Sequence, residues 1–397
     1  MSPRGPDLET WTWREVWQRR LQRHYLSAPA ASRRILDVVA DVCGIHAQVA
    51  ASVELSLGVR VDDLTRSDVR RDLWHSRSLV KTYGLRGTLH VFPSHELALW
   101  LAALRARGPR RPPTPNELDA FPPARRDEML QAIHAALADG PLTRDQLGAE
   151  IGRRVGAWAT EEVFPAFTGR WPRWQLALAP AAVEGLIVFG PNRGNRVTYV
   201  RTDQWLGPQA RIDGQTALRE VCRRYLSTFG PATHLEFARW FLMRPAAALE
   251  LMRTIDLVEV DVQGWRAWLP AADAARPAKT GDGEVHLLPY YDCYIVGAHP
   301  RAQLIPTIAP EPLQKGTAAP FQTLLVDGVV GGLWERHPHG HRLELRVEAF
   351  VALSGRQVEQ VQHQAERIGR ILEVAAERVD VTVSTVARST NTQLGSV

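Results

Sequence analysis

The sequence predicts a mixed α+β protein with three tandem helix-then-hairpin modules before a β-rich C-terminal region. Three observations support this fold class. Helical periodicity is repeatedly followed by two short alternating stretches, which is the pattern of a β-hairpin after helices. One helix-start pattern occurs twice, about 90 residues apart. The last stretch of about 110 residues reads mostly as strands and contains one long amphipathic helix.

The N-terminal region contains several helical patterns and one pair of strands. Residues 78–92, SLVKTYGLRGTLHVF, alternate between apolar and polar side chains and break at Gly84 and Gly87, so two short strands are expected. Helices followed by such a hairpin describe a winged helix-turn-helix. The predicted helices cover residues 11–27, 32–43, 49–58, 66–75 and 94–105. A Pro- and Arg-rich linker or strapped loop is expected at residues 105–123.

The repeated pattern is a helix start. Residues 139–151 (DGPLTRDQLGAEI) and 229–241 (FGPATHLEFARWF) share Gly-Pro-x-Thr, with apolar residues four and eight positions after the threonine. The threonine is expected to cap the helix, and Thr143 with Gln146 fits a capping box. Spacings of four and eight place the apolar residues on one helix face. The sequence therefore predicts a second and a third copy of the module.

Each of these copies ends in a predicted hairpin. The first covers residues 185–201 and turns at 191–195, and the second covers residues 256–270 and turns at Gln263-Gly264. The β-rich region is expected to have strands at 285–297, 321–335 and 341–351 and a helix at 355–379. The predicted domains are a first module with residues 1–110, a second with 111–212, a third with 213–282 and a C-terminal domain with 283–397.

Composition narrows the class of protein. The chain has 397 residues, of which 45% are hydrophobic and 23% are charged, which is typical of a globular protein with real cores. No apolar run reaches the ~18–20 residues that span a bilayer, and the N-terminus lacks the apolar core of a signal peptide. We expect a cytoplasmic, nucleoid-associated protein. The three cysteines are far apart, which predicts buried thiols and no disulfide framework, metal site or cofactor.

The basic residues are almost all arginines. Only three of the 48 are lysines, namely Lys81, which is expected in a strand of the first wing, and Lys279 and Lys315, which are expected in loops. A net charge of +5 and a pI near 9.4 suit a polyanion partner, and the guanidinium fork of arginine suits phosphate. This signal is weak by itself, since many arginines occupy solvated helix faces.

Residues 42–55, VCGIHAQVAASVEL, place two polar side chains in an apolar stretch. Gly44 is suited to end the preceding helix, so residues 45–48 are expected to be extended. In extended chain, residues i and i+2 lie on the same side, which presents His46 and Gln48 together. Two alternatives remain open: these side chains hydrogen-bond loop backbone, or they face a ligand.

Four stretches in order resemble the winged-helix DNA glycosylases of the AlkZ and YcaQ type, and they span nearly the whole chain. They are GIHAQ, LVKTYGLRGTLHVF, LLPYYDCYIVG and LLVDGVVGGLWE. The resemblance implies tandem winged helices around a DNA-binding channel and excision of alkylated bases. The AlkZ-like branch removes bulky adducts and crosslinks made by DNA-alkylating natural products, and several members confer self-resistance on the producing actinomycetes.

The resemblance also implies the catalytic residues. The family motif is Gln-x-Gln or Gln-x-Asp, and the matching positions here are His46-Ala47-Gln48, so the chain departs at the first position. A His-x-Gln form occurs in relatives of the AlkZ branch. An N7-alkylguanine is already a good leaving group, so the enzyme needs only to place water near C1′ and stabilise a sugar cation. Gln48 can orient that water, and His46 can orient it or accept its proton.

Glycosylases that also cut the backbone commonly use an amine. The scarcity of lysine therefore predicts a monofunctional enzyme that leaves an abasic site. Arg193 and Arg196, at the basic hairpin tip, are expected either to enter the minor groove or to form a solvated turn. Arg86 is a candidate for a phosphate contact or for bracing the catalytic loop, and Lys81 for a phosphate contact. Asp292, expected in an apolar strand, is either structural or lines the channel.

Two other function classes fit the modules. One is a winged-helix transcriptional regulator, and the other is a non-catalytic protein that binds and shields adducts. Regulators usually carry one such module and bind palindromes as dimers, whereas three modules in one chain make an asymmetric clamp. We therefore expect a monomer whose partner is double-stranded DNA carrying alkylated guanine.

Overall fold

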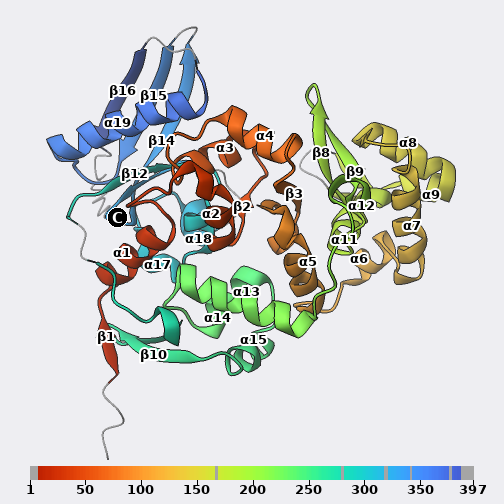
Figure 1. The fold of residues 1–397 in the computed structure, drawn as a ribbon, viewed down its shortest axis with the longest axis horizontal. Helices are drawn as coiled ribbons and strands as arrows, with labels where there is room; N and C mark the ends of the chain where they lie inside the picture. The colour runs from red at the N-terminus through yellow and green to blue at the C-terminus, as the bar shows by residue number, and fades with distance from the viewer. Residues whose placement is uncertain are drawn as a thin grey trace, which may run out of the picture.

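The computed structural model describes residues 8–165, 169–278, 281–316, 321–339, 342–374 and 378–385. The described chain is a mixed α+β protein, as predicted, with one five-stranded sheet and several sheets of two or three strands. Figure 1 shows the five-stranded sheet and its long helix at one end of the molecule and the elements of residues 115–206 at the other. No helix in the described ranges is long and apolar enough to cross a membrane.

The first unit confirms the predicted helices, most of which are slightly shorter than expected. The predicted helix 32–43 begins as a 3₁₀ turn and ends at Asp41. The predicted hairpin at 78–92 is present, and its strands form a sheet in the order β2-β4-β3. The elements are β1 Glu9–Trp11, α1 Trp13–Arg23, η1 Ser32–Arg34, α2 Ile35–Asp41, β2 Ile45–His46, α3 Ala50–Gly58, α4 Arg66–Trp74, β3 Leu79–Tyr83, η2 Leu85–Gly87, β4 Leu89–Pro93, η3 Ser94–Glu96 and α5 Leu97–Ala106.

The second unit contains the first copy of the repeated helix start. Thr143 caps α8 and forms the predicted capping box with Gln146. The predicted linker at 105–123 is not wholly irregular, because a short helix with its own capping box begins after Thr114. The elements are α6 Pro115–Ala120, η4 Pro123–Arg125, α7 Arg126–Ala136, β5 Leu142–Thr143, α8 Arg144–Val155, α9 Ala157–Thr160, β6 Glu162–Pro165, β7 Arg170–Pro172, α10 Arg173–Leu176, α11 Leu178–Val183, β8 Ile187–Arg193, β9 Arg196–Arg201 and α12 Thr202–Leu206.

The third unit contains the second copy. Thr233 caps α14 with a capping box, and Ala232 just before it bridges to Trp268 of the following hairpin. Leu142 occupies the same place in the second unit, where it pairs with Tyr199. The predicted turn at 263–264 is confirmed. The elements are α13 Gly214–Phe229, α14 His234–Phe241, α15 Pro245–Met252, β10 Leu257–Val262, β11 Trp265–Pro270 and η5 Ala271–Asp273.

The C-terminal region corrects three predictions. The strand predicted at 285–297 ends at Leu288, and a short helix follows it. The helix predicted at 355–379 ends at Ile371, and a strand follows. Lys315 ends a short helix instead of lying in a loop, while Lys279 lies outside the described residues. The elements are β12 Val285–Leu288, α16 Cys293–Gly297, α17 Arg301–Leu304, α18 Glu311–Lys315, β13 Thr323–Val326, β14 Val329–His339, β15 Arg342–Ala349, α19 Gly355–Ile371 and β16 Arg378–Thr385.

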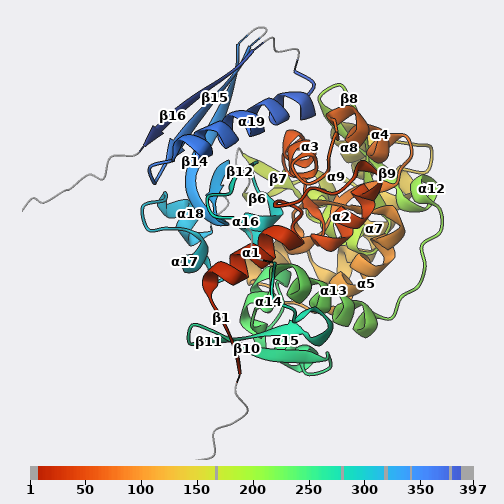
Figure 2. The same cartoon turned by 60° about the vertical axis from the view of Figure 1, so that its left-hand side comes forward.

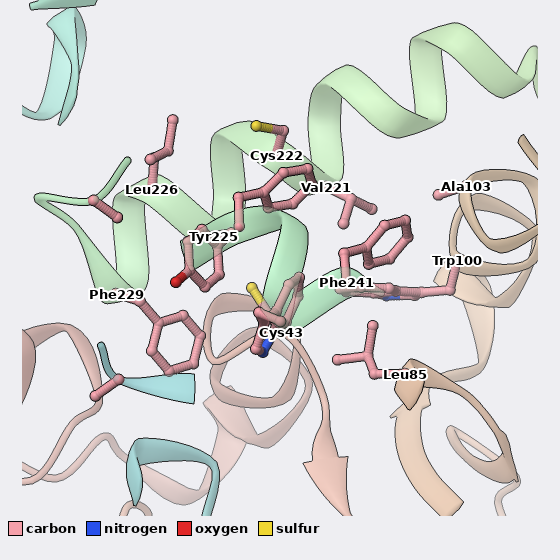
Figure 3. Packing of buried hydrophobic residues seen from close by; sticks show 14 of the residues in the cluster. Cys43, Leu85, Trp100, Ala103, Val221, Cys222, Tyr225, Leu226, Phe229 and Phe241 are labelled. Atoms are coloured by element: carbon pink, nitrogen blue, oxygen red, sulfur yellow. The ribbon is translucent and has the colours of Figure 1, made fainter. Parts of the chain in front are cut away.

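A buried aromatic core around α13 joins these units. Figure 3 shows Tyr225 and Phe229 of α13 pointing toward the first unit, with Phe241 of α14 beside Trp100 of α5. All of these rings are buried. The three cysteines are also buried and free, as expected for structural thiols. Because this core contains side chains from every unit, the helices of residues 214–252 fix the position of the first unit (Figure 2).

Gly44 redirects the chain into β2. The backbone turns left-handed at Cys43 (φ 63°) and Gly44 (φ 90°) before the extended pair Ile45–His46. A Cβ at Gly44 would lie 2.4 Å from the ring of Phe92. That ring is fully buried and stacks on Trp100 with centroids 4.6 Å apart, so it has no room to move. The predicted helix end and extended segment are therefore confirmed.

Substituting Gly44 tests this constraint. Gly44→Ala should lower the free energy of unfolding by about 1–3 kcal/mol more than Gly87→Ala, because overpacking adds to left-handed strain. Gly87 is a matched control, since its φ is +70° but a Cβ added there would meet no atom within 4 Å. Urea denaturation measures both losses. Equal losses at the two glycines would show that Phe92 does not restrict this turn.

Candidate active site

His46 and Lys81 lie on opposite faces of one small sheet. His46 pairs with His90 and His90 with Thr82, whereas the neighbouring row runs from Ile45 through Val91 to Lys81. Side chains of directly paired residues share a face, and successive residues alternate between faces. The side chains of the His46 row and those of the Lys81 row therefore project from opposite faces of the sheet.

His46 lies in an aromatic, mostly dry environment. Its side chain is 7% exposed, its ring stacks on Tyr291 with centroids 5.1 Å apart, and His90 approaches edge-on at 5.0 Å. Burial, together with the charge of Arg86, lowers the pKa of His46 to about 4. Nδ1 of His46 has no hydrogen-bond partner among the described residues. The side chain is thus a neutral imidazole at pH 7 with one nitrogen unused.

Gln48 is exposed, and only part of its hydrogen-bonding capacity is used by the described residues. The backbone N–H of Leu89 donates to Oε1 of Gln48 at 3.1 Å, and the N–H of Ala47 donates to the carbonyl of Leu89 at 2.7 Å. The loop-fastening alternative is therefore observed for one atom of Gln48. A carbonyl oxygen has a second lone pair, and the amide NH₂ has no partner among the described residues. The side chain keeps the capacity to hold a water molecule.

Asp292 is not in a strand. It caps α16 and is 1% exposed, and its carboxylate accepts from both Nη atoms of Arg60, at 2.8 and 2.6 Å. Ser56 donates to the same carboxylate at 2.9 Å. These contacts favour the structural alternative over a place in the channel wall. The pair also fixes Tyr291, the preceding residue, whose φ of 58° is left-handed and whose ring lies on His46.

Arg86 is half-buried at the tip between β3 and β4. Its Nη1 donates to the carbonyl of Trp240 in α14 at 3.1 Å, so it braces the wing against α14 instead of bracing the His46 loop. Burial and the charge of Arg107 lower the pKa of Arg86 to about 10. The guanidinium remains charged at pH 7, and it has no carboxylate partner among the described residues.

Lys81 lies in a cavity of about 410 Å³ between α3, α4 and the tip of the β8–β9 hairpin. Its Nζ is 5.3 Å from the ring centroid of Phe189, and burial lowers its pKa. A lowered pKa favours an amine nucleophile. Geometry opposes that role for the His46 site, because Lys81 points from the other face of the sheet.

The basic hairpin has a tighter turn than predicted. Only Gly194 and Asn195 separate the paired residues Arg193 and Arg196. Arg193 is exposed, yet it donates to Oε1 of Gln146 at 3.2 Å and to the carbonyl of Pro141 at 2.8 Å. Arg196 is exposed and makes no side-chain hydrogen bond or ion pair with the described residues. Arg196 is therefore the freer of the two cations.

Two neighbours of His46 were not among the predicted site residues. Tyr291 stands next to Asp292 within LLPYYDCYIVG, and His90 lies across the ladder from His46. His90 could have been predicted from the pairing of strands, because residues 45–46 pair antiparallel with residues 90–91 and this places His90 opposite His46. Tyr291 has no local signal, since its position depends on the contact between Arg60 and Asp292.

Breaking that contact should destabilise the whole fold. Asp292→Asn should lower the free energy of unfolding by about 3–5 kcal/mol, because it leaves Arg60 buried without its counter-charge. Asp37→Asn is the control, since Asp37 pairs with Arg34 on the surface and such pairs contribute about 0–1 kcal/mol. Guanidinium or urea unfolding of the full chain compares the two. A loss below 1 kcal/mol for Asp292→Asn would contradict the assigned role.

The comparisons with known proteins identify the family. The family described as "DNA glycosylase AlkZ-like" matches residues 39–371, a range that contains His46 and Gln48. The chain is similar to the "Interstrand DNA cross-link repair glycosylase" of Streptomyces sahachiroi, with 28% identity over 335 residues, 82% of this chain and 88% of that one. Its structure is similar to that of Streptomyces sahachiroi DNA glycosylase AlkZ, with a TM-score of 0.79 and 26% identity over 94% of this chain and 100% of that one. The chain belongs to the AlkZ-like family of DNA glycosylases.

Proposed function

We propose that the chain excises bulky N7-alkylguanine adducts from double-stranded DNA, with His46 and Gln48 as its catalytic residues. One observation carries this proposal: a neutral, buried histidine with an unused nitrogen lies two residues from an exposed glutamine with an unused amide. The relative from Streptomyces sahachiroi, named for interstrand cross-link repair, supports crosslinked or bulky adducts as the substrate class. We also propose a role in self-resistance, which the resemblance to the AlkZ-like branch implies.

The chemistry needs little acid catalysis. The bond between C1′ and N9 breaks, and its electron pair neutralises the positive charge of the N7-alkylated purine. A water oxygen then bonds to C1′, and the water proton passes to His46 or to solvent. The products are the free alkylated base and an abasic site. Gln48 and His46 orient the water, and the neutral imidazole can accept a hydrogen bond from it, although its lowered pKa makes His46 a weak base.

A weak catalytic pair favours damaged bases. Normal purines are poor leaving groups at neutral pH, so water placement alone does not release them at a useful rate. A charged N7-alkylguanine leaves readily once water is positioned. Selectivity for damage therefore comes partly from the substrate, and the pocket need not recognise every adduct in detail.

DNA binding is assigned to three winged-helix modules acting as one clamp. The module boundaries are residues 1–110, 111–212 and 213–282, followed by the C-terminal domain, and we infer a monomer. A short strand before the capped helix of the second unit, and a single β-bridge at the same place in the third, support equivalent modules. We propose that Arg196 enters the minor groove with Arg193 beside it, and that Arg86 and Lys81 supply positive charge nearer the sheet.

The alternative is a winged-helix regulator without catalysis. Base release from alkylated duplex DNA decides between them, because a regulator or a shielding protein releases no base. The regulator also requires a preferred sequence, whereas a repair enzyme binds undamaged DNA with little preference.

The catalytic pair is tested by substitution. Gln48→Ala and His46→Ala should each slow single-turnover base release by about 100-fold or more, because each removes a group that places the water. Affinity for undamaged duplex should change little. His46→Gln restores the motif more usual in the family and should keep substantial activity if His46 mainly orients water.

The control for Gln48→Ala is Gln204→Ala. The side chain of Gln204 also hydrogen-bonds a backbone group, because its Nε2 donates to the carbonyl of Ala138 at 2.9 Å. Both substitutions should lower stability by about 0.5–1.5 kcal/mol, and only the first should slow base release. Melting temperature, DNA affinity and base release are measured on the same samples. Fully active alanine variants at both His46 and Gln48 would overturn the assigned site.

The enzyme should leave the DNA backbone intact. Wild-type protein is expected to yield abasic sites that break only with alkali or heat, and borohydride should trap no covalent enzyme–DNA adduct, because lysines are scarce and Lys81 lies on the opposite face of the sheet from His46. Gel analysis with and without alkali checks this. Prompt cleavage that Lys81→Ala abolishes would identify Lys81 as the amine. Prompt cleavage that survives the substitution would refute the argument from lysine scarcity.

A further inference from the structure

A second cavity lies behind the proposed catalytic pair. It has a volume of about 390 Å³ and lies where η2 meets α14, α16, α17 and α18. Tyr291, whose ring stacks on His46, forms part of its wall, and so does Arg86, whose charge lowers the pKa of His46. The cavity is therefore one aromatic ring away from His46, and the proposed reaction does not use it.

The wall of this cavity carries positive charge without neutralising carboxylates. Four cations line it, and no Asp or Glu is among its described lining residues; the cations are Arg86, Arg239, Arg301 and Lys315. Among the described residues, Lys315 is the one cation of the four that has a carboxylate partner, Glu311. Arg301 donates only to neutral carbonyls, those of Ile295 at 3.1 Å and Leu313 at 2.7 Å, and its Nε is buried without a partner among the described residues.

The cations also repel one another. Burial and the charge of Arg239 lower the pKa of Arg301. His299, another wall residue, is 6% exposed, and burial with the surrounding arginines lowers its pKa to about 3. Its Nδ1 has no hydrogen-bond partner among the described residues. An anion in this cavity would relieve the repulsion and give these donors a partner.

A different cavity shows that arginine content alone does not create such a site. The cavity of about 540 Å³ between α2 and α13 is also lined by arginines. There Arg23 pairs with Asp273 and Arg224 with Glu96, at 2.6 Å in both cases. Its charges are internally compensated, so it has no comparable need for an anion.

We propose that the cavity lined by Arg86, Arg239, Arg301 and His299 is a phosphate subsite that holds a backbone phosphate of the DNA strand whose lesion lies at His46. The inference rests on the proposed function for the choice of strand. Arginine is suited to this role, because its fork presents parallel donors to two phosphate oxygens. A phosphate fixed here would hold the nucleotide beside Tyr291 while the base is released.

The test uses Arg239, which is exposed on α14 and makes no side-chain hydrogen bond or ion pair with the described residues. Arg239→Gln should reduce the slope of log affinity against log salt by about 1, since one phosphate contact is lost. Arg356→Gln is the charge-matched control, because Arg356 is also exposed but lies on α19. Undamaged duplex is used, so the result does not depend on base release.

A neutral-phosphate scan then locates the contact. Single methylphosphonates are placed along each strand of a duplex with one central N7-alkylguanine, which fixes the binding register. Wild-type protein should then lose affinity at one or two positions where Arg239→Gln is insensitive. An unchanged slope and scan for Arg239→Gln would overturn the proposal. So would a melting-temperature increase with inorganic phosphate at constant ionic strength without any sensitive scan position, because the cavity would then hold only a free anion. A positive scan without base release would refute the proposed function alone.

Discussion

The buried ion pair between Arg60 and Asp292 is the constraint on which the candidate site depends. Both side chains are fully buried, and they join the end of α3 to the start of α16, 232 residues further along the chain. A buried pair of this kind adds little net stability, but loss of either partner is costly. Its effect here is positional. Because the ion pair fixes Asp292, it also fixes the neighbouring Tyr291, whose ring stacks on His46. The N-terminal motif and the C-terminal domain thus form one site.

The burial that shapes this site also sets its chemistry. Tyr291, His90 and the sheet bury His46. This burial lowers the pKa of His46, so the imidazole stays neutral at pH values well below 6.5. A neutral histidine beside a glutamine suits a reaction whose leaving group already carries positive charge. The same dry surroundings leave Nδ1 of His46 and Nδ1 of His299 without partners among the described residues. Unsatisfied buried polar atoms are costly in a folded protein, and these two atoms therefore support the proposals of a water site at His46 and a phosphate site at His299.

Local chemistry made much of the fold predictable. The capping box of Thr143 and Gln146, the turn at Gln263-Gly264 and the helix end at Gly44 depend on neighbours within a few residues, and all three are present. The failures have long-range causes. LLPYYDCYIVG reads as a strand, yet Asp292 begins a helix because its carboxylate is held by Arg60. His46 and Gln48 were found from an odd polar pair in an apolar stretch, whereas Tyr291 and Arg239 gave no local signal.

The pH dependence of single-turnover base release tests the central claim, that a neutral His46 works in a dry site. With its pKa lowered to about 4, His46 stays unprotonated from pH 8 down to about pH 5, so the rate should be level over that range and fall only as pH approaches 4. His46→Gln should show no fall there, after subtraction of spontaneous base loss measured without enzyme. A wild-type rate that halves near pH 6.5, where an ordinary histidine titrates, would contradict the account, because burial would then not control the protonation of His46.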